Sequence, residues 1–335
     1  MEAFGAEFDA PPGYLNTPSI GIPPRQVADA VAEAVERWRT GADRPPEFDE
    51  YVRRARMAFA RLIGVQGERV AIGASVSHLV GSVAAGVPDG ARVLVAAGEF
   101  TSVSFPFAAH AHRGVTVTEA PLDELPGRAA EFDLVAVSVV QSADGRQVDL
   151  AALEASGTRV LLDASQAAGW LPLSLGWADW VVCAGYKWLL SPRGSAWLAV
   201  HPKAHERTRP VAANWYAGED PWATVYDLPL RLAADARAFD ISPVWFAQVG
   251  AAVALEYLAG LDLAQVRAHC VGLADTLLEK LGLPPGGSAI VSLDADPARV
   301  AAAGLTTSVR GGRVRAGFHL HNTADDVERL LSAFR

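Results

Sequence analysis

Residues 159–200 read RVLLDASQAAGWLPLSLGWADWVVCAGYKWLLSPRGSAWLAV, and this stretch decides the fold of the chain. It holds three apolar runs, at 159–165, 179–185 and 195–200, in which hydrophobic residues follow one another without alternation. Continuous rather than alternating apolar strands are typical of a mostly parallel sheet that is covered on both faces. The stretch therefore predicts the centre of an α/β domain.

The same kind of pattern continues from this stretch toward the N-terminus. Four further runs rich in Val and Leu begin at residues 69, 92, 115 and 133, and helical stretches separate them. Before them, apolar residues at helical spacing predict amphipathic helices over 25–39 and 47–63. The seven runs together predict a mostly parallel sheet between layers of helices.

The pattern changes after Pro243. Two long helical patterns, two short strands and a final helix follow, at 243–260, 262–282, 288–292, 305–317 and from Thr323. This arrangement predicts a smaller α+β domain packed on the first one. We expect three parts, which are an N-terminal arm (1–20), a large domain (21–242) and a small C-terminal domain (243–335).

Composition and charge narrow the class of protein. Of the 335 residues, 50% are hydrophobic and 20% are charged, which is typical of a folded globular chain. The net charge of −9 argues against nucleic acid or an anionic membrane as a partner, because both need a dense cationic face. No secretion signal and no apolar span of about 20 residues is expected. Cys183 and Cys270 lie in apolar stretches without CxxC spacing, which fits a reducing, cytoplasmic location.

Two charged residues follow predicted buried strands within 159–200. Asp163 lies at the carboxyl end of one strand, where open α/β sheets place ligand-binding groups, and Lys187 directly follows the next strand. A buried carboxylate and a buried amine are both costly to desolvate, so each needs a partner. The alternative is structural, with Asp163 capping the next helix while Lys187 extends its amine to solvent.

The motif around these residues resembles the class V aminotransferase-like enzymes of the fold-type I pyridoxal 5'-phosphate (PLP) group, which includes cysteine desulfurases, kynureninases and isopenicillin N epimerase. The matching residues are Asp163, Gln166, Tyr186, Lys187, Trp188, Leu189 and Gly194. The resemblance covers nearly the whole chain in element order. It implies a PLP cofactor and a large domain with a mixed, mostly parallel seven-stranded sheet between helices, followed by a small α+β domain.

The resemblance also implies a role for each motif residue. Lys187 would be the Schiff-base lysine that forms the internal aldimine and later shuttles protons. Asp163 would pair with the protonated pyridine nitrogen, and Gln166 would bond the ring hydroxyl oxygen. These roles agree with the chemistry, because a protonated ring withdraws electrons and an apolar pocket lowers the pKa of a lysine.

Cofactor phosphate is expected at the start of a helix. The segment IGASVSHLVGS at 72–82 follows the first strand, and we expect the backbone of Ala74, Ser75 and Val76 to hold the phosphate. The alternative for Ser75 is a plain helix cap. The resemblance implies that the Tyr186 hydroxyl and Ser242 of the partner subunit complete this set.

Two further residues follow strand ends that face the same expected site. Phe100 matches the family position of an aromatic or His side chain stacked on the cofactor, although a large aromatic after a strand also suits the core. Gln141 ends another apolar run and is expected to contact the cofactor or the substrate.

We expect the substrate to contact residues near both ends of the chain and one aromatic segment. By the resemblance, Arg315 holds the substrate carboxylate, a role that suits the guanidinium fork. Asn16 resembles part of the N-terminal stretch that folds over the site, with simple turn chemistry as the alternative. Trp215 and Tyr216 resemble an aromatic segment that lines the site and would suit an apolar or aromatic substrate side chain.

These features favour a PLP-dependent enzyme that acts on an α-amino acid through an external aldimine, by amino transfer or by β-elimination such as carbon–sulfur cleavage. Residues 283–314 contain no cysteine, which argues against persulfide-forming desulfurase chemistry. An epimerase, a kynureninase-like hydrolase and a PLP-binding protein without catalysis remain alternatives. A homodimer with shared active sites is expected, and no metal site, because the His110/His112 and His319/His321 pairs lack a third ligand.

Overall fold

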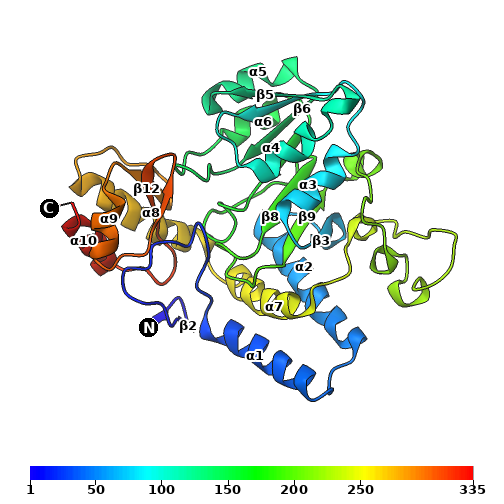
Figure 1. The fold of residues 1–335 in the computed structure, drawn as a ribbon, viewed down its shortest axis with the longest axis horizontal. Helices are drawn as coiled ribbons and strands as arrows, with labels where there is room; N and C mark the ends of the chain where they lie inside the picture. The colour runs from blue at the N-terminus through cyan, green and yellow to red at the C-terminus, as the bar shows by residue number, and fades with distance from the viewer. Residues whose placement is uncertain (335) are drawn as a thin grey trace.

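The computed structural model describes residues 1–334 and is built around a seven-stranded mixed sheet (Figure 1). Its strands are β3 (Val70–Gly73), β4 (Arg92–Ala96), β5 (Thr116–Ala120), β6 (Leu134–Ser138), β7 (Val160–Asp163), β8 (Trp180–Ala184) and β9 (Ala196–Val200). The strand order is β3-β9-β8-β7-β6-β4-β5, and only β9 runs antiparallel to its neighbours in the described sheet. Each predicted apolar run forms one strand, which confirms the fold class.

Helices cover both faces of this sheet. They are α1 (Arg25–Arg39), α2 (Asp49–Ile63), α3 (Val76–Ala84), α4 (Thr101–Ala108), α5 (Leu125–Arg128), α6 (Leu150–Ala155) and α7 (Trp245–Ala259). Alternate strand residues belong to two cores. Val70 and Ile72 are part of the core that includes residues of α2, α6 and α7, whereas Ala71 is part of the core that includes residues of α3 and α4. Because both strand faces are buried, the strands read as continuous apolar runs.

A smaller lobe follows α7. It contains α8 (Leu263–Lys280), β10 (Ile290–Leu293), α9 (Pro297–Ala302), β11 (Ser308–Arg310), β12 (Arg313–Gly317) and α10 (Ala324–Ser332). The sequence predicted one strand over 305–317, which is wrong, because Gly311 and Gly312 turn the chain into the β11–β12 hairpin. Helix α7 packs on α1 and α2. The domain boundaries at 20/21 and 242/243 stay a prediction.

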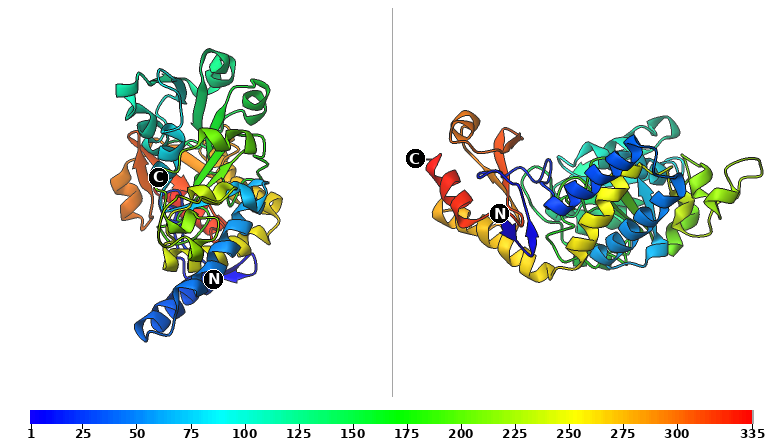
Figure 2. Two further views of the ribbon diagram at one scale, coloured as in Figure 1. Left: turned by 90° about the vertical axis from the view of Figure 1, so that its right-hand side faces the viewer. Right: turned by 90° about the horizontal axis from the view of Figure 1, so that it is seen from below.

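The N-terminal arm begins with the hairpin β1 (Glu2–Ala3) and β2 (Ala6–Glu7) and joins the two lobes (Figure 2). On the small lobe, Leu15 N donates to the Thr306 carbonyl at 2.9 Å. On the sheet side, Gly21 N donates to the Tyr186 carbonyl at 2.9 Å. A Cβ atom at Gly21 would lie 2.0 Å from the Lys187 carbonyl oxygen, so this approach requires glycine.

No single helix within residues 1–334 is long and apolar enough to cross a membrane. Helices α7 and α8 pass the test only as a pair, and the chain bends by 91° between them.

Candidate active site

A cavity of about 100 Å³ opens at the carboxyl ends of β7 and β8. Strand β3 runs in the same direction as β8, since both are antiparallel to β9, so α3 begins at the same edge of the sheet. The lining residues are Ala74, Ser75, Val76, Ser77, Phe100, Ser102, Asp163, Ser165, Ala184, Tyr186, Lys187 and Arg193. The topology thus brings the predicted phosphate loop together with the two predicted catalytic residues.

Lys187 and Asp163 are buried in this cavity, with 7% and 4% of their surfaces exposed. Within residues 1–334, the Lys187 amine has no hydrogen-bond or ion-pair partner. Burial lowers the pKa of Lys187, and the negative charge of Asp163 offsets this effect only in part. Burial also raises the pKa of Asp163, whose Oδ1 accepts a hydrogen bond from Ser165 N at 2.8 Å. Both groups are therefore biased toward their neutral forms.

Two aromatic rings flank the Lys187 amine. Its Nζ lies 5.2 Å from the ring centroid of Phe100 and 5.7 Å from that of Tyr186. Phe100 is the N-cap residue of α4 and is 41% exposed, because it lines the cavity instead of packing in the core. A flat group bound beside Lys187 would have an aromatic surface available for stacking.

The start of α3 and one arginine form a cationic end of the cavity. Ser75 is the N-cap residue, and its Oγ accepts a hydrogen bond from His78 N at 3.4 Å. Unpaired backbone N–H groups and the helix dipole at such an N-terminus attract anions. Arg193 adds a full positive charge, with its guanidinium carbon 4.9 Å from the Tyr186 ring centroid and no acidic partner within residues 1–334.

The two glutamines predicted to contact the cofactor are buried but do not line the cavity. The Gln166 amide donates to the Pro18 carbonyl at 3.0 Å, and its oxygen accepts from Trp188 Nε1 at 2.7 Å. Gln141 Nε2 donates to Glu99 Oε2 at 3.1 Å. Gln166 thus ties the arm to the turn after β8, and Gln141 satisfies a buried carboxylate.

Arg315 is a buried cation without an acidic partner in the described part of the chain. Its guanidinium donates to the Ser142 carbonyl at 2.6 Å, to Ser19 Oγ at 2.8 Å and to Ser308 Oγ at 3.1 Å. Burial lowers the pKa of Arg315 to about 10, which leaves it charged at neutral pH. Asn16 pairs with the end of β12, and its Oδ1 has no partner among residues 1–334. A guanidinium bonded only to neutral oxygens is suited to a carboxylate.

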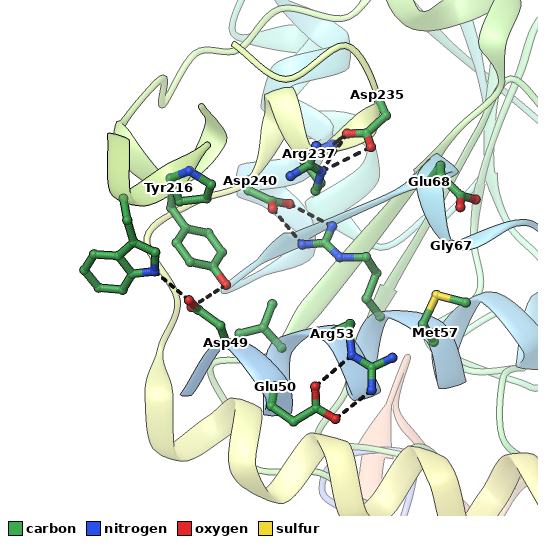
Figure 3. A pocket seen from close by; sticks show the side chains of 14 residues that line it. Asp49, Glu50, Arg53, Met57, Gly67, Glu68, Tyr216, Asp235, Arg237 and Asp240 are labelled. Carbon is green, nitrogen blue, oxygen red and sulfur yellow. Dashed lines mark hydrogen bonds and ion pairs between the residues drawn. The ribbon is translucent and has the colours of Figure 1, made fainter. Parts of the chain in front are cut away.

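The aromatic segment lies away from this cavity. Tyr216 lines a second cavity of about 420 Å³ between α2 and the segment before α7 (Figure 3). Its hydroxyl donates to Asp49 Oδ1 at 3.0 Å, and Trp222 Nε1 donates to Asp49 Oδ2 at 2.7 Å. Trp215 packs against Trp222 with ring centroids 4.9 Å apart. Ser242, at the end of this segment, is exposed.

A family model described as aminotransferase class-V matches residues 14–303. The chain belongs to the aminotransferase class-V family. It is therefore a PLP-dependent enzyme, as the sequence motif around Lys187 predicted.

Two curated proteins are similar in sequence to this class-V chain. An uncharacterized aminotransferase of Bacillus subtilis (strain 168), YcbU, is 28% identical over 313 residues, which cover 83% of this chain and 81% of that protein. The isopenicillin N epimerase of Streptomyces clavuligerus is 29% identical over 228 residues, which cover 60% of this chain and 56% of the epimerase.

Solved structures share the fold at low sequence identity. The apo cysteine desulfurase of Thermococcus onnurineus NA1 has a TM-score of 0.84 at 19% identity and covers 96% of this chain and 94% of its own. The cystine C-S lyase C-DES, in complex with its product cysteine persulfide, has a TM-score of 0.84 at 20% identity and covers 96% of this chain and 97% of its own. These likenesses support fold type I.

The cavity of the class-V chain fits PLP in its donor set. It offers an unpartnered amine at Lys187, a carboxylate at Asp163 and a cationic end at α3. Only one oxygen of Asp163 has a hydrogen-bond partner in residues 1–334, so the other is available to a ring nitrogen. An aldehyde, a pyridine nitrogen and a phosphate are the groups that this set would bind.

Sequence reasoning missed several lining residues. Ser77, Ser102 and Ser165 line the cavity, and Ser165 Oγ accepts a hydrogen bond from Ala184 N at 2.9 Å. Arg193 was also missed. Its position in the Gly-containing loop after the motif lysine was a signal that could have found it, because a cation beside a predicted phosphate site needs an anion.

His319 and His321 are buried side chains of the small lobe. His319 and His321 lie beyond the end of β12, not on it, and burial lowers their pKa values to about 3 and about 4. His319 Nε2 lies 3.0 Å from the Trp188 carbonyl. The described residues contain no group of three or more His, Cys, Asp or Glu placed to hold a metal ion.

Proposed function

We propose that this enzyme carries out PLP-dependent chemistry at the Cα atom of an α-amino acid, by amino transfer or by elimination of a β-substituent such as a thiolate. The observation that carries the proposal is the buried Lys187 amine, which shares one cavity with Asp163 and has no partner within residues 1–334. A structural role for Lys187 would leave the cost of this burial only partly compensated, because the charge of Asp163 offsets it in part.

Each cavity group has a role in the proposal. Bound PLP would supply an electron sink for the bond that breaks at Cα. Asp163 would keep the ring nitrogen protonated, and Phe100 would stack on the ring. Lys187 would hold the cofactor and move the Cα proton, because its lowered pKa favours the neutral amine that acts as a base. Arg193 and the α3 backbone at 74–76 would bind the phosphate.

Arg315 would bind the substrate α-carboxylate with its guanidinium fork. The positive charge of Arg315 helps to lower the pKa of Lys187, so an anion bound to Arg315 would offset this effect on Lys187. Asn16 would add its unpartnered Oδ1 at the arm. A bond from Gln166 to the ring hydroxyl would require its amide to leave the Pro18 carbonyl.

Specific observations bear on two related reactions, epimerisation and persulfide transfer. The similarity to isopenicillin N epimerase supports epimerisation as the second candidate, since it also begins with removal of the Cα proton. Persulfide transfer is not proposed, because Cys183 and Cys270 are both buried and burial raises the pKa of each thiol.

The experiment incubates the PLP-loaded enzyme with a panel of amino acids and assays keto acids, pyruvate, sulfide and inversion at Cα. A keto acid from an added amino acid indicates amino transfer, pyruvate with sulfide indicates elimination, and inversion alone favours the epimerase. No product and no exchange of any Cα proton would contradict the proposal and leave a PLP-binding protein without catalysis.

We also propose a homodimer with shared sites, to which Ser242 of the partner subunit contributes. Its support is the segment before α7, which projects from the body of the chain and exposes Tyr226, Leu228 and Leu230 (Figure 1). A cytoplasmic location stays a prediction.

A further inference from the structure

A tight hairpin at the edge of the small lobe places three arginines on one face. In the β11–β12 pair, Arg310 lies directly opposite Arg313, and Arg315 follows two residues later in β12. The turn between them is Gly311–Gly312, with φ values of +55° and +77°, as a two-residue hairpin turn of type I′ requires. Opposite residues, and residues two apart in a strand, share a face. The three arginine side chains therefore leave the hairpin on the same side.

This face carries uncompensated positive charge. Within residues 1–334, no Asp or Glu lies within ion-pair distance of Arg310, Arg313 or Arg315. Like charges directly opposite each other destabilise an antiparallel pair, and a buried guanidinium without a counter-ion is still more costly. An anion bound at this face would remove both costs.

The three arginines differ in what they contact. Arg313 is held on the neighbouring strand, where Nε and Nη2 donate to Oγ and to the carbonyl of Ser292, each at 3.1 Å. Arg310 is exposed and donates only to the Val309 carbonyl of its own strand, at 2.8 Å. Its charge contributes to lowering the pKa of both Lys187 and Arg315. Arg310 is thus an exposed cation whose guanidinium contacts only its own strand and whose charge influences Lys187 and Arg315.

The hairpin carries charge, whereas the sequence predicted aromatic contacts for the substrate side chain. Tyr216 lines the second cavity and Trp215 packs on Trp222 of that lining, and neither Trp215 nor Tyr216 lines the cavity beside Lys187. Ser308, two residues before Arg310 on the same face, accepts a hydrogen bond from Arg315 Nε at 3.1 Å. The hairpin therefore joins Arg310 to the residue that would hold the α-carboxylate.

We propose that Arg310 binds a second anionic group on the substrate, so that the enzyme prefers α-amino acids whose side chain ends in a carboxylate or an equivalent anion. This inference rests on the proposed function, in which Arg315 binds the α-carboxylate. Nη1 of Arg310 donates to the Val309 carbonyl, and its Nε and Nη2 have no partner within residues 1–334, which leaves one edge of the guanidinium for such a group.

The test compares amino acids that match in shape and differ in charge, aspartate with asparagine and glutamate with glutamine. The PLP-loaded enzyme is incubated with each in heavy water, and loss of the Cα proton is followed by NMR, which reads a step common to transfer, elimination and epimerisation. We expect kcat/KM for the charged member of at least one pair to exceed that of the amide by about tenfold or more.

Two variants complete the test. Arg310→Gln should remove the preference, so that the charged member and its amide react with similar kcat/KM. Arg313→Gln is the matched control, because it removes the same charge from the same face, and it should keep the preference. Equal rates for acid and amide in the unmodified enzyme, or a preference that survives Arg310→Gln, would overturn the inference alone. Absence of exchange with every amino acid would overturn the proposed function as well.

Discussion

Burial disfavours the charged forms of both Lys187 and Asp163, and the attraction between the two charges offsets part of this effect. Desolvation is the main cause that lowers the pKa of Lys187 and raises that of Asp163, while their mutual attraction works in the opposite direction. A cationic ring nitrogen beside Asp163 would give the carboxylate a permanent partner. The lysine would then be free to exist as a neutral amine, which is the form that reacts with carbonyl groups.

Covalent attachment of the cofactor should occur at Lys187 alone. The chain contains three lysines, and Lys203 and Lys280 are exposed and distant from the cavity lining. Borohydride reduction of the PLP-loaded enzyme, followed by peptide mass mapping, should place the pyridoxyl group on Lys187. Lys187→Ala should abolish the label, whereas Lys203→Ala should keep it. A label on Lys203 or Lys280 in the unmodified enzyme would contradict the assignment.

Asp163→Asn should lower turnover by about 100-fold or more while cofactor binding persists, because the ring nitrogen would lose the charge that keeps it protonated. The substitution should also move the Lys187 titration. The carboxylate raises the pKa of Lys187, so its removal should lower that pKa further below 10.5, and the amine should become neutral at a lower pH.

The titration is measured by NMR on the cofactor-free protein after isotopic dimethylation of its lysines. The Lys203 and Lys280 signals serve as internal controls, because the substitution is distant from both residues. Turnover equal to that of the unmodified enzyme would remove Asp163 from the mechanism, and an unmoved Lys187 signal would show that the two groups are not coupled.

The place of a residue in the site was predictable where neighbouring sequence determines it, and not where contacts with distant parts of the chain determine it. Asp163 and Lys187 follow strand ends, and a strand end at the carboxyl edge of a parallel sheet is readable from the sequence. The side-chain partners of Gln166 are Pro18, Ser142 and Trp188, of which Pro18 is far along the chain, and no local pattern encodes that contact. Tyr216 was assigned to the site because its segment resembles an aromatic segment of the family, and such a resemblance does not say which cavity a loop faces.

At the scale of elements, the apolar runs predicted all seven strands because both faces of this sheet are buried. The helix at 25–39 was also predicted with the bounds that α1 has. The β11–β12 hairpin was not separated, because its strands are three and five residues long and carry arginines on one face in place of an apolar pattern. Short polar strands are recognised mainly by their turn, here Gly311–Gly312.

The start of α3 should bind an anion together with Arg193. Arg193→Ala should weaken PLP affinity by about tenfold, since it removes a full positive charge near a phosphate that the helix N-terminus binds with partial charges. Affinity for pyridoxal, which lacks the phosphate, should stay the same. Both are measured by spectroscopic titration of the cofactor-free protein, with Arg299→Ala on α9 as a matched control outside the cavity. Equal loss for PLP and pyridoxal would contradict a phosphate contact.

At the scale of the whole molecule, the projecting segment lies on the side of the large domain away from the small lobe and the arm (Figure 1). The arm folds back onto the small lobe and onto the turn that holds Lys187. The segment before α7 exposes Tyr226 and Leu228, of which 80% and 86% of the surface is accessible. Apolar side chains held this far from any core need a second surface to cover them. A second copy of the chain would cover two such segments at once by symmetry.

If the sites are shared, two inactive variants should restore each other. Lys187→Ala removes the cofactor lysine, and Ser242→Asp places a negative charge where the partner's Ser242 would approach the phosphate. Each homodimer should be inactive. A hybrid dimer, isolated with two different tags, would contain one site with Lys187 from one chain and an unmodified Ser242 from the other, and it should regain activity. An inactive hybrid would mean that Ser242 acts within its own chain or not at all. Light scattering gives the mass of the active species. Full activity of a species with the 35.3 kDa mass of one chain would exclude the shared site altogether.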